Sequence, residues 1–278
     1  MRVDPRPNGI ASPALTAILA DGRRRQRNAL AATIGGTAVI VGAFAYAGAF
    51  ELHRYADALS TIGQLAADSL PPDFSRLPHW GRPLLETLAM SVAGTVLGAA
   101  AALPLGALAA RNIVRQAILG GAARLFLNVL RSIPGLIWGV IFVAAVGFGP
   151  LPGILALATH STGMLGKFFA ETLEHVDPGP GDALRSIGVS RVGVLRFSIL
   201  PQILPRLIDV TIYRWEHNLR AATTLGVVGV GGLGLEIVTA FHLFEYREAS
   251  ALIIVLLSLV TLINIVGARV RARLLGGL

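Results

Sequence analysis

The most informative stretch of the chain runs from residue 177 to residue 201 and reads DPGPGDALRSIGVSRVGVLRFSILP. Its prolines and Asp182 can begin a short helix, and Gly188 can end that helix in a left-handed turn. Ser190 can then cap a second helix, and Pro201 can close it. The stretch therefore predicts a compact pair of helices joined by a tight turn.

Long apolar stretches flank this segment on both sides. The chain is 54% hydrophobic and only 14% charged, with a mean hydropathy of +0.66, which is typical of a protein dissolved in a bilayer. A hydrocarbon core takes about 20 helical residues to cross. Six stretches are long enough, at residues 30–50, 84–110, 133–149, 151–173, 207–230 and 251–268. The sequence predicts an all-α transmembrane bundle of about six spans, with the third and fourth forming a hairpin.

The basic residues predict how these spans are oriented. Seventeen arginines lie in segments 2–27, 111–131, 185–206 and 269–273, and only Arg54, Arg76, Arg82 and Arg247 lie in the alternate segments. Since short cytoplasmic loops retain arginine, both termini should be cytoplasmic in a bacterial inner-membrane protein. The net charge of +8 is spread between apolar runs. A nucleic-acid partner would need the basic residues on one solvated face, so none is expected.

The N-terminal region allows two interpretations. Arginines at residues 23–27 followed by an apolar run and the tripeptide AYA at 45–47 resemble a cleaved signal peptide. The apolar run is about twice the usual length for such a peptide, which favours an uncleaved first span. We therefore expect a basic cytoplasmic segment at 1–29, a first span with an external loop at 30–83, and a transmembrane domain at 84–278 that contains a cytoplasmic loop at 175–206.

Several motifs of soluble enzymes match only in part. Gly229, Gly231 and Gly234 fit the spacing of a dinucleotide-binding loop, but the strand and helix that must flank such a loop are missing. Gly166 and Lys167 resemble the end of an ATP-binding loop, yet Phe168 stands where a magnesium ligand belongs. The chain has no cysteine, and it shows no paired carboxylates, histidine cluster or nucleophile triad. We expect no cofactor, metal or catalytic residue on this chain.

The segment from residue 177 resembles the EAA loop of ABC importer permeases, whose pattern is E-A-A, three residues, G, nine residues, I-x-L-P. Six residues align with this pattern in register: Asp182, Ala183, Leu184, Gly188, Leu200 and Pro201. Asp182 replaces the usual Glu, Leu184 replaces the second Ala, and Ser198 replaces the Ile. In that family the loop is the coupling helix that docks in a groove of the ATPase subunit. The resemblance implies that these residues contact an ATPase here. An ordinary amphipathic helix pair at the membrane surface is the alternative.

Further stretches narrow the resemblance to phosphonate-type permeases of the MetI-like, type I importer fold. They read RSIPGLIW at 131–138, FGP at 148–150, HSTGMLGKFFAE at 160–171 and YRWEHNLRAAT at 213–223. The family implies import of phosphonate or a related phosphorus oxyanion, with phosphite, phosphate or a methionine-like solute as alternatives. It also implies a separate ATPase that binds ATP and Mg²⁺, a periplasmic or lipoprotein substrate-binding protein, and a second permease copy in a homodimer.

Ionisable residues inside spans are candidates for the translocation pathway, because each is costly in lipid. Glu216 and Arg220 are one helical turn apart and are predicted to pair. The pair would either lock the fifth span to its neighbours or take part in transport. His160 should lie near the middle of the membrane, as a packing residue or as a substrate contact.

Glycines predict a break after the fifth span. Gly229, Gly231, Gly232 and Gly234 follow one another closely, and each weakens a helix by up to about 1 kcal/mol relative to alanine. Irregular backbone at membrane depth survives only beside protein or a water-filled cavity. The break is therefore expected at a pathway or gate.

Two other function classes compete with an importer permease. A membrane-embedded enzyme would need clustered catalytic residues at one interface, which the sequence lacks. A passive channel would conduct without ATP.

Overall fold

The computed structural model describes residues 13–114 and 116–275, and these are helical apart from turns and short loops. The prediction of an all-α protein is confirmed. The chain forms two compact units, Met1–Leu65 and Ala66–Leu278.

The first unit contains α1 (Pro13–Tyr46) and most of α2 (Leu52–Asp68). Residues 21–46 of α1 are long and apolar enough to cross a membrane. The helix starts well before the predicted span because the arginine cluster is itself helical, with Arg25 paired to Asp21 at 3.0 Å. The amphipathic α2 occupies part of the segment predicted as an external loop.

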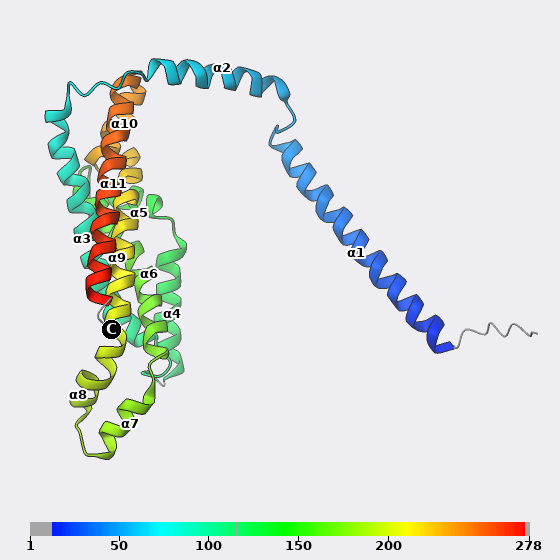
Figure 1. The fold of residues 1–278 in the computed structure, drawn as a ribbon, viewed down its shortest axis with the longest axis vertical. Helices are drawn as coiled ribbons and strands as arrows, with labels where there is room; N and C mark the ends of the chain where they lie inside the picture. Colours follow the sequence, from blue (N-terminus) through cyan, green and yellow to red (C-terminus); the bar gives the residue numbers. More distant parts are fainter. Residues whose placement is uncertain (1–12, 115, 276–278) are drawn as a thin grey trace, which may run out of the picture. The chain divides into compact units, whose positions relative to one another are not determined.

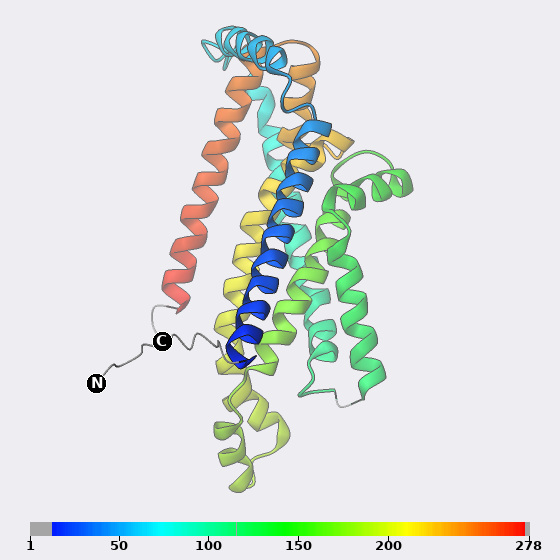
Figure 2. The same cartoon turned by 90° about the vertical axis from the view of Figure 1, so that its right-hand side faces the viewer.

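The second unit is a helical bundle. Its elements are η1 (Leu77–Trp80), α3 (Gly81–Ala109), α4 (Ala117–Ser132), α5 (Gly135–Val146), α6 (Pro150–Glu174), α7 (Pro178–Ser186), α8 (Arg191–Val194), η2 (Leu195–Ile199), α9 (Leu200–Leu225), η3 (Gly226–Val228), α10 (Gly232–His242) and α11 (Tyr246–Leu275). Helices α3, α6, α9 and α11 run alongside one another, and α7 and α8 extend beyond one end (Figures 1 and 2).

Small residues bring α3 and α6 into close contact at the centre of the bundle. A Cβ added at Gly94 would lie 2.6 Å from Cβ of Leu157, and one at Gly98 would lie 2.7 Å from Cβ of Ser161. Glycine at these positions therefore allows the two backbones to approach closely, as expected for helix packing in membranes. Gly139 packs in the same way on Leu225, whereas Gly135 has open space around it.

By length and composition, three helices among the described residues could cross a membrane: Asp21–Tyr46, Leu77–Ala109 and Tyr246–Arg273. Two bent pairs pass the same test, namely α4 with α5, bent by 89°, and Arg191–Val228 with α10, bent by 45°.

The predicted third span, 133–149, has a different structure. Its helix α5 has 12 residues, about 18 Å, which is too short to cross a hydrocarbon core alone. The sequence prediction missed α4, the longer partner of α5, because Arg124 and Arg131 made the region read as a cytoplasmic loop. Pro134 lies at the bend, between the end of α4 at Ser132 and the start of α5 at Gly135. A proline at this position cannot continue the preceding helix.

The end of the bundle opposite α7 and α8 is tied together by polar contacts. Arg76 lies 2.9 Å from Glu248, and the Asp73 amide donates to the carbonyl of Arg247. Hydrogen bonds from Ser75 lower the pKa of Asp73, and the Glu248 carboxylate raises the pKa of Arg76. These contacts fix the segment before α3 against the start of α11.

Candidate functional site

Helices α7 and α8 form the helix pair that the sequence predicts. Asp177 caps α7, its side chain accepting from the amide of Gly179 at 2.9 Å, and Pro178 occupies the first turn. The chain then turns at Gly188, whose φ of +84° is the left-handed conformation that favours glycine. Ser190 caps α8 by accepting from the amide of Gly193 at 3.3 Å.

The prediction that Pro201 closes the second helix is wrong. Helix α8 continues through the π-helical η2 into α9, and Pro201 lies in the first turn of α9. Proline has no amide hydrogen to donate to the preceding turn, and the π-helical turn of η2 lies just before Pro201.

The α7–α8 segment, residues 177–199, presents an exposed surface away from the bundle. Asp182 and Ala183 are exposed, and Asp182 is bonded to Arg185 on the same helix. At the tip, Ile187 is 74% exposed and Val192 is 75% exposed. Leu184 is half-buried, Gly188 is exposed at the turn, and Leu200 and Pro201 are exposed at the start of α9. Large apolar side chains exposed together mark a surface for a protein partner.

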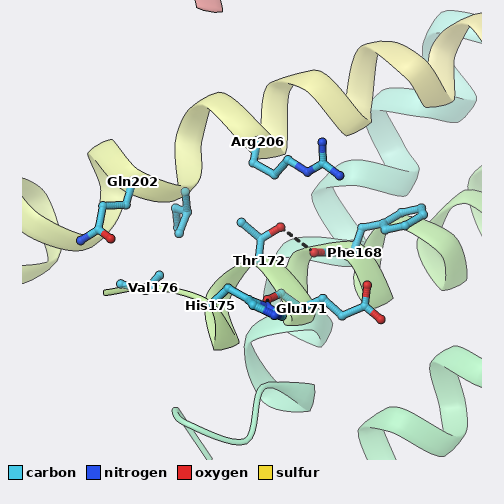
Figure 3. A pocket seen from close by; sticks show the side chains of 8 residues that line it. Phe168, Glu171, Thr172, His175, Val176, Gln202 and Arg206 are labelled. Atoms are coloured by element: carbon cyan, nitrogen blue, oxygen red, sulfur yellow. Dashed lines mark hydrogen bonds between the residues drawn. The ribbon is translucent and has the colours of Figure 1, made fainter. Parts of the chain in front are cut away.

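The base of this segment is fixed to α9 by a reciprocal pair of hydrogen bonds. The Asp177 amide donates to Oε1 of Gln202 at 3.0 Å, and Nε2 of Gln202 donates to the Asp177 carbonyl at 3.3 Å. Beside it, a cavity of about 340 Å³ separates the end of α6 from the start of α9. Figure 3 shows Glu171 and His175 on the α6 side of this cavity and Arg206 on the α9 side.

A second cavity, of about 280 Å³, lies deeper in the bundle between α5, α6 and α9. Its ionisable lining consists of His160 from α6 and Arg214, His217 and Arg220 from α9. No carboxylate lines this cavity among the residues that the structure describes. Arg214 is only 5% exposed, whereas His217 and Arg220 are open to the cavity.

A buried polar network holds Arg214 in place. Its Nε donates to Oγ of Ser161 at 3.0 Å. Ser161 also accepts from Nδ2 of Asn218 at 2.8 Å, and Nδ2 of Asn218 donates to Thr95 at 2.9 Å. The network joins α3, α6 and α9 directly behind the cavity. On the same helix as Ser161, Nδ1 of His160 lies 3.2 Å from the carbonyl of Ile133.

The predicted pairing of Glu216 with Arg220 is wrong. The partner of Glu216 is Arg271 on α11, whose Nη2 lies 2.8 Å from Oε1 of Glu216. The two groups form an ion pair, but their geometry does not meet the criteria of a hydrogen bond. Gly267 allows this approach, since a Cβ there would lie 2.1 Å from the same oxygen. Glu216 therefore faces α11, on the side of α9 away from the cavity. The structure brings Arg220 and His160 to one cavity and separates Glu216 from both.

Sequence reasoning did not select Arg214 and His217, although a signal for them was present. Residues 214, 217, 221 and 224 follow a spacing of three and four, which places them on one face of a helix. All four line the cavity.

The predicted glycine break is confirmed between α9 and α10. Gly229, Gly231 and Gly232 have φ values of +85°, +88° and +72°. Helix α3 holds the break, because the Gly232 amide donates to Glu86 at 3.1 Å and the Leu233 amide donates to Thr87 at 2.9 Å. Gly234 packs on the backbone of Thr223. These glycines are not part of the cavity lining, so their predicted role as a gate stays a prediction.

A third cavity, of about 290 Å³, lies between the end of α3, α4 and α6. It is lined by Arg124, Arg131 and Lys167, together with Glu171 and Glu174. Lys167 and Glu171, one helical turn apart on α6, form an ion pair at 3.4 Å. Residues 160, 167, 171 and 174 lie on one face of α6, and this face contributes His160 to the second cavity and the other three residues to the third.

Comparison with known families decides the class of protein. The family model described as binding-protein-dependent transport system inner membrane component matches residues 102–275. The chain belongs to this family. These inner membrane components include the phosphite transport system permease protein of Stutzerimonas stutzeri, which is 48% identical over 79% of this chain and 80% of its own length.

A second relative and a solved structure are also similar to this chain. The phosphate-import permease protein of Mycolicibacterium smegmatis is 38% identical over 79% of this chain and 41% of its own length. A chain in an inward-facing structure of the MetNI methionine ABC transporter matches with a TM-score of 0.63, at 24% identity, over 70% of this chain and 95% of that one. At this identity the match shows a shared fold.

Proposed function

We propose that this chain is the permease subunit of an ABC importer that moves phosphite, phosphonate or phosphate into the cytoplasm. The observation that carries the proposal is the α7–α8 segment, which matches the EAA pattern and presents Asp182, Ala183 and the apolar residues Ile187 and Val192 beyond the bundle. A partner ATPase that binds ATP and Mg²⁺ would dock on this surface and drive transport.

The orientation follows from this assignment and from the arginine distribution. If α7 and α8 are cytoplasmic, both termini lie on the same side as the ATPase, in agreement with the positive-inside rule. The opposite end of the bundle, where Arg76 contacts Glu248, would then receive a substrate-binding protein in the periplasm. The chain would be a multi-pass protein of the bacterial inner membrane.

The assembly is proposed to be a homodimer with twofold symmetry. Two copies would place two α7–α8 segments over two ATPase subunits, and cyclic dimers are the commonest symmetric assemblies. The two arginines and two histidines of the cavity between α5, α6 and α9 suit an anionic substrate. Two relatives named for phosphite transport and phosphate import support a phosphorus oxyanion.

The docking surface is tested with Ile187→Glu, which places a charge in the exposed apolar tip without touching the core. We expect the purified complex to lose its ATPase, and ATP hydrolysis stimulated by loaded binding protein to fall at least about tenfold, because a buried unpaired charge opposes association. Leu70→Glu is the matched control at the opposite end of the bundle, where Leu70 is also exposed. This control should retain the ATPase. Normal recovery and stimulation with Ile187→Glu would refute docking at α7–α8.

A further inference from the structure

We infer that the cavity between α5, α6 and α9 is a binding site for the transported oxyanion within the permease itself, with Arg214 as its central contact. The inference rests on the proposed function and goes beyond it, since an importer can rely on its binding protein alone for substrate recognition.

The first argument is the unbalanced charge of Arg214. The residue is only 5% exposed, and its one hydrogen bond to the described residues runs from Nε to the neutral hydroxyl of Ser161. No ion pair of Arg214 is present within the described part of the chain, and the cavity it lines contains no carboxylate there. A buried cation without a partner is costly, and an arginine stays charged in proteins. An anion in the cavity would supply the missing partner.

The second argument is the arrangement of the other polar groups. Arg214, His217 and Arg220 from α9 and His160 from α6 all line this one cavity. Guanidinium groups recognise tetrahedral oxyanions through paired, charge-assisted hydrogen bonds. The rest of the lining is apolar or small, including Gly135, Leu136 and Ala221. A few convergent polar groups in an apolar wall are the usual composition of a small-ligand site.

The third argument is that Arg214 is held ready for a ligand. Ser161 receives hydrogen bonds from both Arg214 and Asn218, and Asn218 is tied to Thr95 on α3. Three helices thus fix the guanidinium before any anion arrives. Such preorganisation lowers the entropic cost of binding.

The test is titration of the complex of permease and ATPase, in lipid nanodiscs and without binding protein, with phosphite, phosphate and methylphosphonate in turn. Isothermal calorimetry should show saturable binding of at least one of these anions. Arg214→Gln keeps a hydrogen-bonding side chain but removes the charge, and should weaken binding at least about tenfold. Arg220→Gln changes an exposed residue, so it tests the site even if Arg214→Gln does not assemble, and it should weaken binding several-fold.

The matched control is Arg206→Gln, which makes the same charge change on α9. Arg206 is paired with Asp209 and lies outside this cavity, so its variant should bind as the unmodified complex does. Absence of saturable binding to the unmodified complex would overturn the inference. So would Arg220→Gln and Arg214→Gln complexes that bind the anions as tightly as the unmodified complex does. ATP-driven uptake with loaded binding protein, measured in parallel, would still report on the importer function separately.

Discussion

At the scale of single residues, the ion pair between Glu216 and Arg271 joins α9 to α11 in the interior. Glu216 is only 8% exposed, and Arg271→Gln would leave its carboxylate without a partner. Breaking a buried pair in this way costs about 3–5 kcal/mol. We expect Arg271→Gln to lower membrane abundance and the midpoint of thermal unfolding.

The double variant Glu216→Gln with Arg271→Gln provides the control for this prediction. Two neutral side chains leave no buried charge, so abundance and the unfolding midpoint should recover largely. Arg220→Gln should leave both nearly unchanged, because Arg220 is not the partner of Glu216. A stability loss with Arg220→Gln as large as that with Arg271→Gln would contradict the assignment.

These residues also show how far local sequence reasoning reaches. Lys167 and Glu171 pair as their spacing of one helical turn favours, because both lie on one face of α6. Glu216 has an equally suitable local partner in Arg220, but it forms an ion pair with Arg271, which is 55 positions further along the chain. Sequence spacing cannot show that α11 passes beside α9, nor that Gly267 opens a place for the carboxylate. Arg214 was overlooked for the same reason, since its burial depends on three helices.

At the scale of elements, the break between α9 and α10 depends on glycine at positions of close contact. A Cβ at Gly234 would lie 1.9 Å from the carbonyl oxygen of Thr223. Gly234→Ala should therefore push α10 away from α9 and lower the unfolding midpoint and transport together, by overpacking worth about 1–3 kcal/mol.

Gly121→Ala on α4 is the matched control for this prediction. Nothing lies within 4 Å of a Cβ at Gly121, and alanine favours a helix over glycine by up to about 1 kcal/mol. Its unfolding midpoint should stay the same or rise. Equal behaviour of the two variants would show that close packing at Gly234 is unimportant.

Elements were predicted well where local signals were strong. The caps of α7 and α8 follow from Asp177, Pro178, Gly188 and Ser190, whose conformational preferences act within a few residues. Helix α4 was missed because Arg124 and Arg131 made its sequence read as a loop, whereas both line a cavity between α3, α4 and α6. A hydropathy count cannot distinguish an arginine in a loop from one that lines an internal cavity.

At the scale of the whole molecule, composition and the EAA pattern were sufficient for the fold class and the family. The predicted α-helical architecture, the helix pair at 177–199 and the glycine break are all present. The bent pair of α4 and α5 could not be predicted from composition, because neither helix alone has the length of a span. The cation-lined cavity likewise depends on how α5, α6 and α9 pack.

The central claim is that this chain couples ATP hydrolysis on a partner to oxyanion import. The most direct measurement uses lipid vesicles that contain the assembled permease and ATPase, loaded with ATP, with binding protein and phosphite, phosphate or methylphosphonate outside. Our account predicts that at least one of these anions accumulates inside the ATP-loaded vesicles, and that none does with ADP inside or without binding protein. Equal entry of the anions with ATP and ADP, or no accumulation of any of the three, would contradict it.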